Sequence, residues 1–172
     1  MSTAITIKTT TMKLLLAFTT LFFLSCSRQT ETDTSSATTE NKTEISQDAN
    51  VALNFINDYT AFCSQKDQDS NWIRNNALLT ENFKSTYYHL LDSARKEDPE
   101  LGLGFDPIFD AQDFPDKGFE LSALDKSTGF VTLEGKDSPE FILVLKISEQ
   151  NGKWLVDGSG VINIPADKRA KR

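Results

Sequence analysis

The sequence is poor in the residues that enzymes use most for nucleophilic and metal chemistry. One histidine, His89, occurs among 172 residues, and it falls on the polar face of a predicted helix. Nucleophilic catalysis usually requires a general base beside the nucleophile. The sequence also lacks a phosphate-binding glycine loop, the ligand spacing of a zinc site and a dinucleotide fingerprint. We therefore expect no cofactor, and we expect His89 to be a surface residue.

Basic residues are scarce as well. The formal net charge is −7, whereas nucleic-acid binding requires a basic surface that engages phosphates. The basic residues cluster once, in the sequence KRAKR that begins at Lys168. We interpret residues 167–172 as a solvated basic tail, and we expect no nucleic-acid partner.

The apolar stretch near the N-terminus is short. Leu14–Leu24 has eleven residues without charge, and a membrane-spanning helix needs about 20. Lys13 precedes it, and a positive residue followed by a short apolar run is typical of an export signal. We expect translation to start at Met12 and residues 1–25 to act as a signal peptide.

The end of this segment, Phe23-Leu24-Ser25-Cys26, resembles the lipobox of bacterial lipoproteins. The resemblance implies cleavage before Cys26 and attachment of lipid to its thiol, which would hold the protein on a membrane of the cell envelope. Ser27 after the cysteine implies delivery to the outer membrane, with the domain facing the periplasm or the cell surface. The alternative is ordinary cleavage that leaves Cys26 free or in a disulfide.

A polar segment follows the cysteine. Ser27–Asp48 consists almost entirely of Thr, Ser, Glu, Asp, Gln, Asn and Lys. Such a segment buries too little apolar surface to offset chain entropy, so residues 26–48 are expected to form a disordered tether. If Cys26 is acylated, Cys63 has no disulfide partner in the monomer. Removal of residues 1–25 would take the net charge from −7 to −9.

Two amphipathic helices are expected to open the folded domain, which we place at residues 49–166. Apolar residues recur at helical spacing in Asn50–Lys66 and in Glu81–Asp98, and Thr80 is the expected N-cap of the second helix. Cys63 falls on the apolar stripe of the first helix. Burial in the core would leave this thiol unreactive.

A predicted antiparallel meander follows. Its strands are Phe119–Leu124, Phe130–Leu133, Glu140–Ser148 and Lys153–Ile164. Asn151-Gly152 is a strong hairpin signal, and Gly158 and Gly160 predict a bend or bulge in the last strand. The fold class is therefore α+β, with N-terminal helices packed on a curved antiparallel sheet of about four strands. The concave side of that sheet is the expected place for a pocket.

A motif separates the helices from the strands. Phe105-Asp106-Pro107-Ile108 is followed by Ala111-Gln112-Asp113 and Pro115, and Lys153-Trp154 lies on a later strand. This pattern resembles a bacterial family described as domain of unknown function 3828, over about residues 51–165. The resemblance implies a cone-like fold similar to nuclear transport factor two and the cystatin-like superfamily. Because that fold hosts enzymes, carriers and immunity proteins, it does not decide function.

The motif lies in an acidic loop. Residues 97–116 include seven acidic side chains and no basic one. An Asp-Pro pair sets a turn when the carboxylate accepts N–H groups of its own loop, so we favour a structural role. A calcium site or the rim of a ligand site are the alternatives, although the spacing is not that of an EF-hand. All three interpretations use the same side chains: Asp106, Asp110, Gln112 and Asp113.

Asp157 is the candidate for acid–base catalysis. It follows apolar residues on the last predicted strand, and burial inside a cone would raise its pKa and make it a general base. The alternative is an aspartate at a strand end that faces solvent or caps a turn. No other residue is proposed as catalytic.

The sequence thus favours a membrane-anchored lipoprotein whose domain binds a small ligand or a protein partner without catalysis. An acid–base enzyme of the hydrolase, dehydratase or isomerase type is the first alternative. A calcium-stabilised binding module is the second. The clustered acidic residues could also dock a basic partner.

Overall fold

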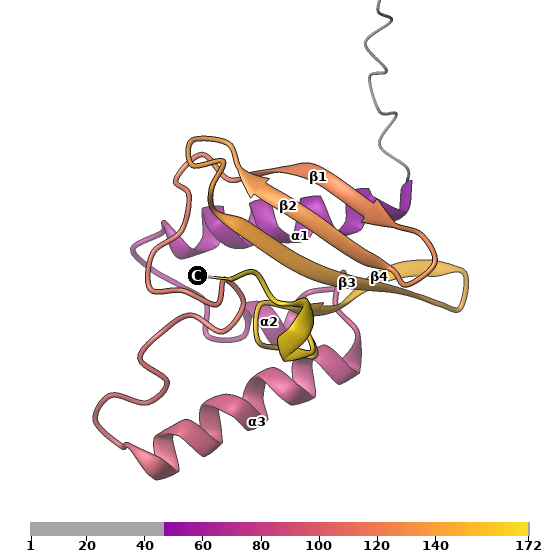
Figure 1. The fold of residues 1–172 in the computed structure, drawn as a ribbon. Coiled ribbons are helices and arrows are strands. Elements are labelled where there is room, and N and C mark those ends of the chain that lie inside the picture. The colour runs from indigo at the N-terminus through magenta and orange to yellow at the C-terminus, as the bar shows by residue number, and fades with distance from the viewer. Residues whose placement is uncertain (1–46, 172) are drawn as a thin grey trace, which may run out of the picture. The chain divides into compact units, whose positions relative to one another are not determined.

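The computed structural model describes residues 47–171. The predicted signal peptide, Cys26 and all but the last two residues of the predicted tether lie outside the described residues. The elements follow one another as α1 (Gln47–Cys63), α2 (Trp72–Asn75), α3 (Glu81–Glu97), β1 (Phe119–Asp125), β2 (Phe130–Gly135), β3 (Ile142–Gln150), β4 (Lys153–Ser159) and a 3-10 helix (Ala166–Lys168). The described part is an α+β fold with an open antiparallel sheet in the order β1-β2-β3-β4 (Figure 1), which confirms the predicted class.

Helix α1 begins three residues earlier than predicted. It starts at Gln47, and both Ala49 and Ala52 are completely buried, so the helix is packed on the core from its first turn. The tether prediction is therefore wrong for Gln47 and Asp48, which belong to this helix. The helix also ends at Cys63, not at Lys66. Helix α1 contacts all four strands and lies along one face of the sheet (Figure 1).

The inner strands alternate between two environments. On β2 and β3 every second side chain is completely or almost completely buried, and these side chains are Val131, Leu133, Leu143, Leu145 and Ile147. The residues between them are only half-buried. Strand β3 is an inner strand, as predicted, but only one of its faces is fully covered, because α1 packs on one face of the sheet.

Strand β4 is shorter than predicted. It ends at Ser159, where Gly160 takes a φ of 57° and the chain turns back. Ser159 and Ile162 then exchange backbone hydrogen bonds of 3.0 and 2.9 Å. A bulge precedes this turn, since Val156 pairs with Ile147 and Gly158 pairs with Lys146. The expected irregularity in this segment is therefore confirmed, while the predicted continuation to Ile164 is wrong.

The C-terminal residues fold back on this turn. Arg169 donates from Nε to the Ile164 carbonyl at 2.9 Å and from Nη2 to the Val161 carbonyl at 3.2 Å. Its side chain is half-buried. The prediction of a solvated tail is therefore wrong for Arg169, because its guanidinium satisfies two carbonyls that the turn leaves without strand partners.

The start of α3 is fixed by its cap, as predicted. The Thr80 hydroxyl oxygen accepts the Phe83 N–H at 3.0 Å. The residues just before the cap form a parallel bridge between Leu79 and Val156, which joins the helix start to β4. His89 is exposed, as predicted. Within residues 47–171, none of the helices is both long and apolar enough to cross a bilayer.

Candidate functional site

The motif loop is held by Asp106. Its Oδ1 accepts the N–H groups of Ile108 at 2.8 Å and Phe109 at 3.0 Å, which is the turn expected of an Asp-Pro pair. The Asp106 N–H also donates to the Ala111 carbonyl at 2.9 Å, and the Ala111 N–H donates back at 3.4 Å. The loop thus closes on itself through hydrogen bonds of its own backbone and of Asp106.

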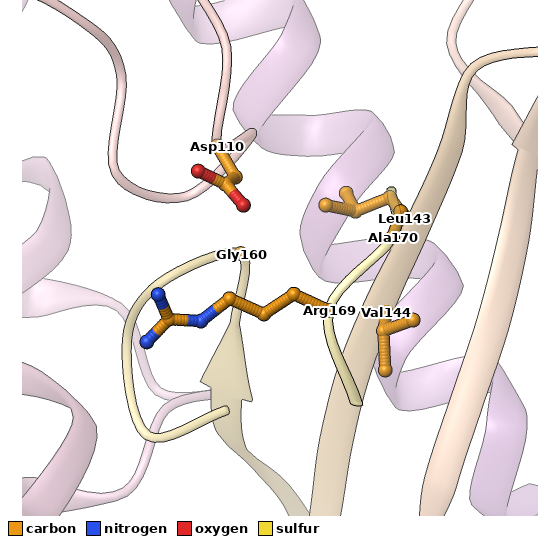
Figure 2. Close-up of a pocket in the computed structure, with 6 residues that line it drawn as sticks. All are labelled: Asp110, Leu143, Val144, Gly160, Arg169 and Ala170. Carbon is orange, nitrogen blue, oxygen red and sulfur yellow. The ribbon is translucent and has the colours of Figure 1, made fainter. Parts of the chain in front are cut away.

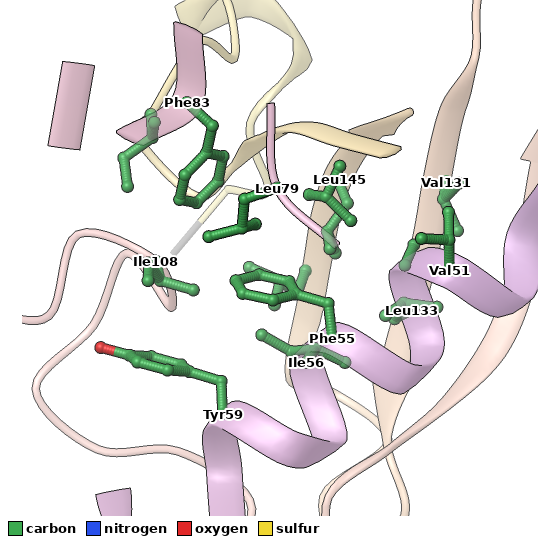
Figure 3. Close-up of a cluster of buried hydrophobic side chains, with 14 of the residues drawn as sticks. Val51, Phe55, Ile56, Tyr59, Leu79, Phe83, Ile108, Val131, Leu133 and Leu145 are labelled. Carbon is green, nitrogen blue, oxygen red and sulfur yellow. The ribbon is translucent and has the colours of Figure 1, made fainter. Parts of the chain in front are cut away.

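Aromatic and aliphatic side chains anchor the loop in the core. Ile108 and Phe109 are completely buried. The Phe109 ring stacks on Phe114 at 4.5 Å and packs against Tyr59 at 5.2 Å between ring centroids. Figure 3 shows Ile108 on the loop beside the core side chains of α1. The structural role predicted for this loop rests on these contacts together with the Asp106 turn.

The loop is also tied to the end of β4. The Ser159 hydroxyl donates to the Ile108 carbonyl at 2.8 Å, and the Val161 N–H donates to the Pro107 carbonyl at 3.0 Å. Ser159 is completely buried, so its hydroxyl needs such a partner. The motif therefore joins two parts of the chain that lie about fifty residues apart.

Helix α1 reaches the same aspartate from the other side. The Tyr59 hydroxyl donates to Asp106 Oδ2 at 2.6 Å. Burial, and next the negative charge of Asp106, raise the pKa of Tyr59 well above its usual range. The phenol is therefore a permanent donor, and Figure 3 shows its oxygen directed away from α1 on the side where the loop lies.

A cleft opens beside this hydrogen bond. Its volume is about 700 Å³, and it lies among α1, α2, α3 and the motif loop. Aromatic rings supply much of its wall, namely Tyr59, Phe62, Tyr87, Tyr88 and Phe114. Four charged side chains also line it, namely Asp69, Asp92, Arg95 and Asp106. Of these four charged residues only Asp106 is half-buried, while the others are exposed at the rim.

Cys63 lies in the cleft wall and not in the core interior. The prediction of a buried core thiol is wrong to this extent, because the residue ends α1 at the cleft edge and its side chain is half-buried. Burial, and next the charge of Asp106, raise the pKa of Cys63 to about 11. Little thiolate therefore exists at neutral pH, and the thiol is expected to be unreactive, as the sequence suggested.

The same charge acts on a third group. Burial, and next the charge of Asp106, raise the pKa of Tyr87 to about 12. Tyr59, Cys63 and Tyr87 come from two helices, yet all three resist ionisation partly because of one carboxylate. The inner part of the cleft is therefore a negative environment.

The other acidic residues of the motif point elsewhere. Asp110 takes a left-handed φ of 55° and borders a shallow hollow that has hardly any free volume, together with Gly160 and Arg169 (Figure 2). Asp113 is exposed. Gln112 lines the cleft and donates from Nε2 to the Gly104 carbonyl at 3.2 Å. In the part of the chain that the structure describes, no three His, Cys, Asp or Glu side chains gather to hold a metal ion.

Asp157 belongs to β4, and its side chain lies beside the start of α3. Its Oδ1 accepts the Thr80 hydroxyl at 2.7 Å and the Asn82 side-chain amide at 3.3 Å. Thr80 in turn caps the helix, so Asp157 supports the cap. The bulge at this residue carries its side chain to the helix end, and Asp157 is not among the residues that line the cleft. This position matches the turn-capping alternative better than the general base.

The sequence did not reveal the aromatic wall. Helical spacing places Tyr59, Phe62 and Tyr87 on the apolar stripes of the two helices, which predicts core packing and not a cleft wall. One signal was available, because α1 and α3 both carry tyrosine on or beside these stripes, and tyrosine pairs an apolar ring with a polar group.

The described fold is an α+β domain with an aromatic-lined cleft between its helices and a motif-bearing loop. Comparisons of the chain with protein-family models, with curated proteins and with solved structures found no match. What the domain can do is therefore inferred from its own residues.

Proposed function

We propose that this chain is a membrane-anchored lipoprotein whose domain binds a small organic molecule in the cleft without catalysis. The cleft volume carries this proposal. At about 700 Å³ it falls inside the range of about 300–1,000 Å³ that is typical of small-molecule sites. Its wall combines aromatic rings with about as many polar and charged side chains, so it is more polar than most small-molecule sites and suits a ligand that carries a polar group.

An enzyme receives less support from the geometry. Asp106 already accepts three hydrogen bonds that hold the loop and Tyr59. Its carboxylate is thus already used to hold the structure together. Asp157 supports a helix cap, and the Cys63 thiol has a raised pKa. Binding therefore explains the cleft with fewer assumptions than acid–base catalysis does.

Filling the cleft should abolish binding. Ser70 is an exposed residue at the cleft wall, and Asn71 is its exposed neighbour outside the wall. We expect Ser70→Trp to occupy the cleft and to remove at least about 90% of the binding of any molecule that enters it, because a buried ligand and an indole cannot share the space. Asn71→Trp should bind as the unchanged protein does.

The measurement is saturation-transfer NMR of a fragment library on the full-length chain in a non-ionic detergent. Circular dichroism of both variants confirms that they fold. Hits that bind Ser70→Trp and Asn71→Trp equally well would show that the cleft is not the site, and a library without any hit would count against a small-molecule site.

Membrane attachment is proposed from the lipobox-like sequence at Cys26. Two or three acyl chains on this residue would bind the membrane stably, and the segment after it would hold the domain away from the surface. We expect Cys26→Ala to move the protein from the membrane fraction to the soluble fraction or to block its processing, and to remove the mass of the lipid. Cys63→Ala is the matched control, and it should leave both unchanged. Fractionation and intact-mass spectrometry that find Cys26→Ala identical to the unchanged protein would refute lipidation.

We also propose that the domain belongs with the cone-like folds of the nuclear transport factor two type. The support is the F-D-P-I-x-x-A-Q-D-x-P motif and the placement of α1 along one face of the open sheet. An experimental structure would test this proposal directly, since a sheet that does not curve around α1 would contradict it.

A further inference from the structure

We propose that the cleft selects an organic cation, specifically an amine or ammonium group attached to an apolar body; this inference rests on the proposed ligand-binding function. Two features of the cleft support it independently. One is the distribution of charge between its interior and its rim, and the other is the density of aromatic rings in its wall.

The interior charge is negative. Asp106 is the half-buried charged residue of the wall, and α1, α3 and the motif loop all face it. The exposed carboxylates of Asp69 and Asp92 add to this charge at the rim. Arg95 is the one basic residue among the lining residues, and it is exposed. Because water screens exposed charges more than buried ones, the interior carboxylate dominates over the rim arginine.

The effect of this charge extends across the cleft. Asp106 contributes to the raised pKa values of Tyr59, Cys63 and Tyr87, which lie on two helices. Burial is the largest cause of each shift, and burial opposes a charge of either sign. The second cause, the charge of Asp106, opposes an added anion and favours a cation.

The aromatic wall suits a cation as well. The faces of aromatic rings attract cations within about 6 Å of the ring centroid. The Tyr88 ring already attracts a cation of the protein itself, because the Arg74 guanidinium lies 4.5 Å from its centroid, so a ligand cation would contact the other rings of the wall. Tyr87 packs edge-on against Tyr88 at 5.2 Å between ring centroids, so two ring orientations line α3 at this point. An apolar body would contact the same rings.

Asp106 retains room for one more hydrogen bond. A carboxylate offers about four lone-pair positions. Oδ1 accepts two N–H groups and Oδ2 accepts the Tyr59 hydroxyl, which together use three of them. An ammonium N–H is a suitable donor for the remaining position, because a charge-assisted hydrogen bond is stronger than a neutral one. A carboxylate or phosphate ligand would be repelled there.

Three probes of matched size test the charge preference. They are 2-phenylethylamine, 2-phenylethanol and 3-phenylpropionate, which are cationic, neutral and anionic at pH 7. Isothermal titration of each into the full-length chain in a non-ionic detergent gives the dissociation constants. We expect the amine to bind about tenfold more tightly than the alcohol or the acid, since a partly desolvated cation gains from both the rings and the carboxylate.

Two variants connect this preference to the site. Asp106→Asn should remove most of the tenfold preference for the amine over the alcohol. Tyr87→Leu should also reduce the preference for the amine over the alcohol, although Asp106 remains in place. If Asp106→Asn does not fold, this second variant still tests whether the cleft selects a cation. Asp58→Asn is the control, because Asp58 lies on α1 outside the cleft, and it should change nothing.

The outcomes separate this inference from the proposed function. Equal binding of all three probes, or a preference for the acid, would overturn the choice of a cation and leave a small-molecule site intact. Failure of the amine to bind at all would also overturn it, while the cleft-filling variant would still decide whether the cleft binds other molecules. A preference that survives both substitutions would place the amine at a different site.

Discussion

Replacement of Asp106 by alanine is expected to lower the free energy of unfolding by about 3 kcal/mol, because it removes the acceptor of three hydrogen bonds. The N–H groups of Ile108 and Phe109 and the Tyr59 hydroxyl would lose their partner, and Phe109 and Ile108 are completely buried. For a domain of this size the loss corresponds to a fall in the melting temperature of roughly 10 °C. Thermal unfolding followed by circular dichroism measures it.

Asp113 supplies the matched control within the same motif. It is exposed, and no hydrogen bond involving its side chain is found among the described residues. Asp113→Ala should therefore change the free energy of unfolding by less than about 0.5 kcal/mol. Neither calcium nor EDTA should change the melting temperature of Asp106→Ala or of Asp113→Ala. If millimolar calcium raised the melting temperature of the unchanged protein but not that of Asp113→Ala, the motif would instead be a cation site. An ion bound to the native state stabilises that state by mass action.

Asp106 has two compatible roles, one in the loop and one in the cleft. Three of its lone-pair positions shape the loop, and its charge faces the cleft. A half-buried carboxylate costs free energy through desolvation, which the three donors offset. The same carboxylate can therefore shape the loop and face a cation in the cleft.

Much of the fold could be predicted from local patterns. Helical spacing identified α1 and α3, the Thr80 cap was found from the sequence, and Asn151-Gly152 joins β3 to β4 as expected. These features depend on residues close together in the chain. The errors came from long-range packing, since burial of Ala49 extends α1 and the turn at Gly160 ends β4.

The site was predicted only in part, because it too depends on long-range packing. The role of Asp106 in its turn is local, so the Asp-Pro pair revealed it. The cleft instead depends on how α3 lies relative to α1, which brings Tyr87 near Tyr59 and Asp106. Periodicity places these tyrosines on or beside apolar stripes, but it does not predict that a cleft remains between α1 and α3. Asp157 is not a cleft residue, because the register shift beside it places its side chain at the start of α3; the glycines predicted an irregularity in this strand but not the direction in which Asp157 would point.

The turn after β4 is expected to tolerate no side chain at Gly160. Gly160→Ala should lower the free energy of unfolding by about 4 kcal/mol, of which about 1–2 kcal/mol arises from the left-handed backbone. The rest arises from crowding, because an added Cβ would lie 2.5 Å from the carbonyl oxygens of both Pro107 and Ile108. Those oxygens accept hydrogen bonds from Val161 and Ser159, so moving them breaks the contacts between the motif loop and β4.

Gly152 separates the two contributions. Its φ is 75°, also left-handed, yet an added Cβ would meet nothing within 4 Å. Gly152→Ala should therefore cost only about 1 kcal/mol, which is the backbone term alone. Urea unfolding of both variants measures the difference. Equal losses would mean that the motif loop yields easily at Gly160, and a loop that yields could not hold Asp106 in a fixed position at the cleft. A loss that is larger by about 3 kcal/mol at Gly160 would show that strand, loop and cleft wall form one rigid unit, as a preorganised binding site requires.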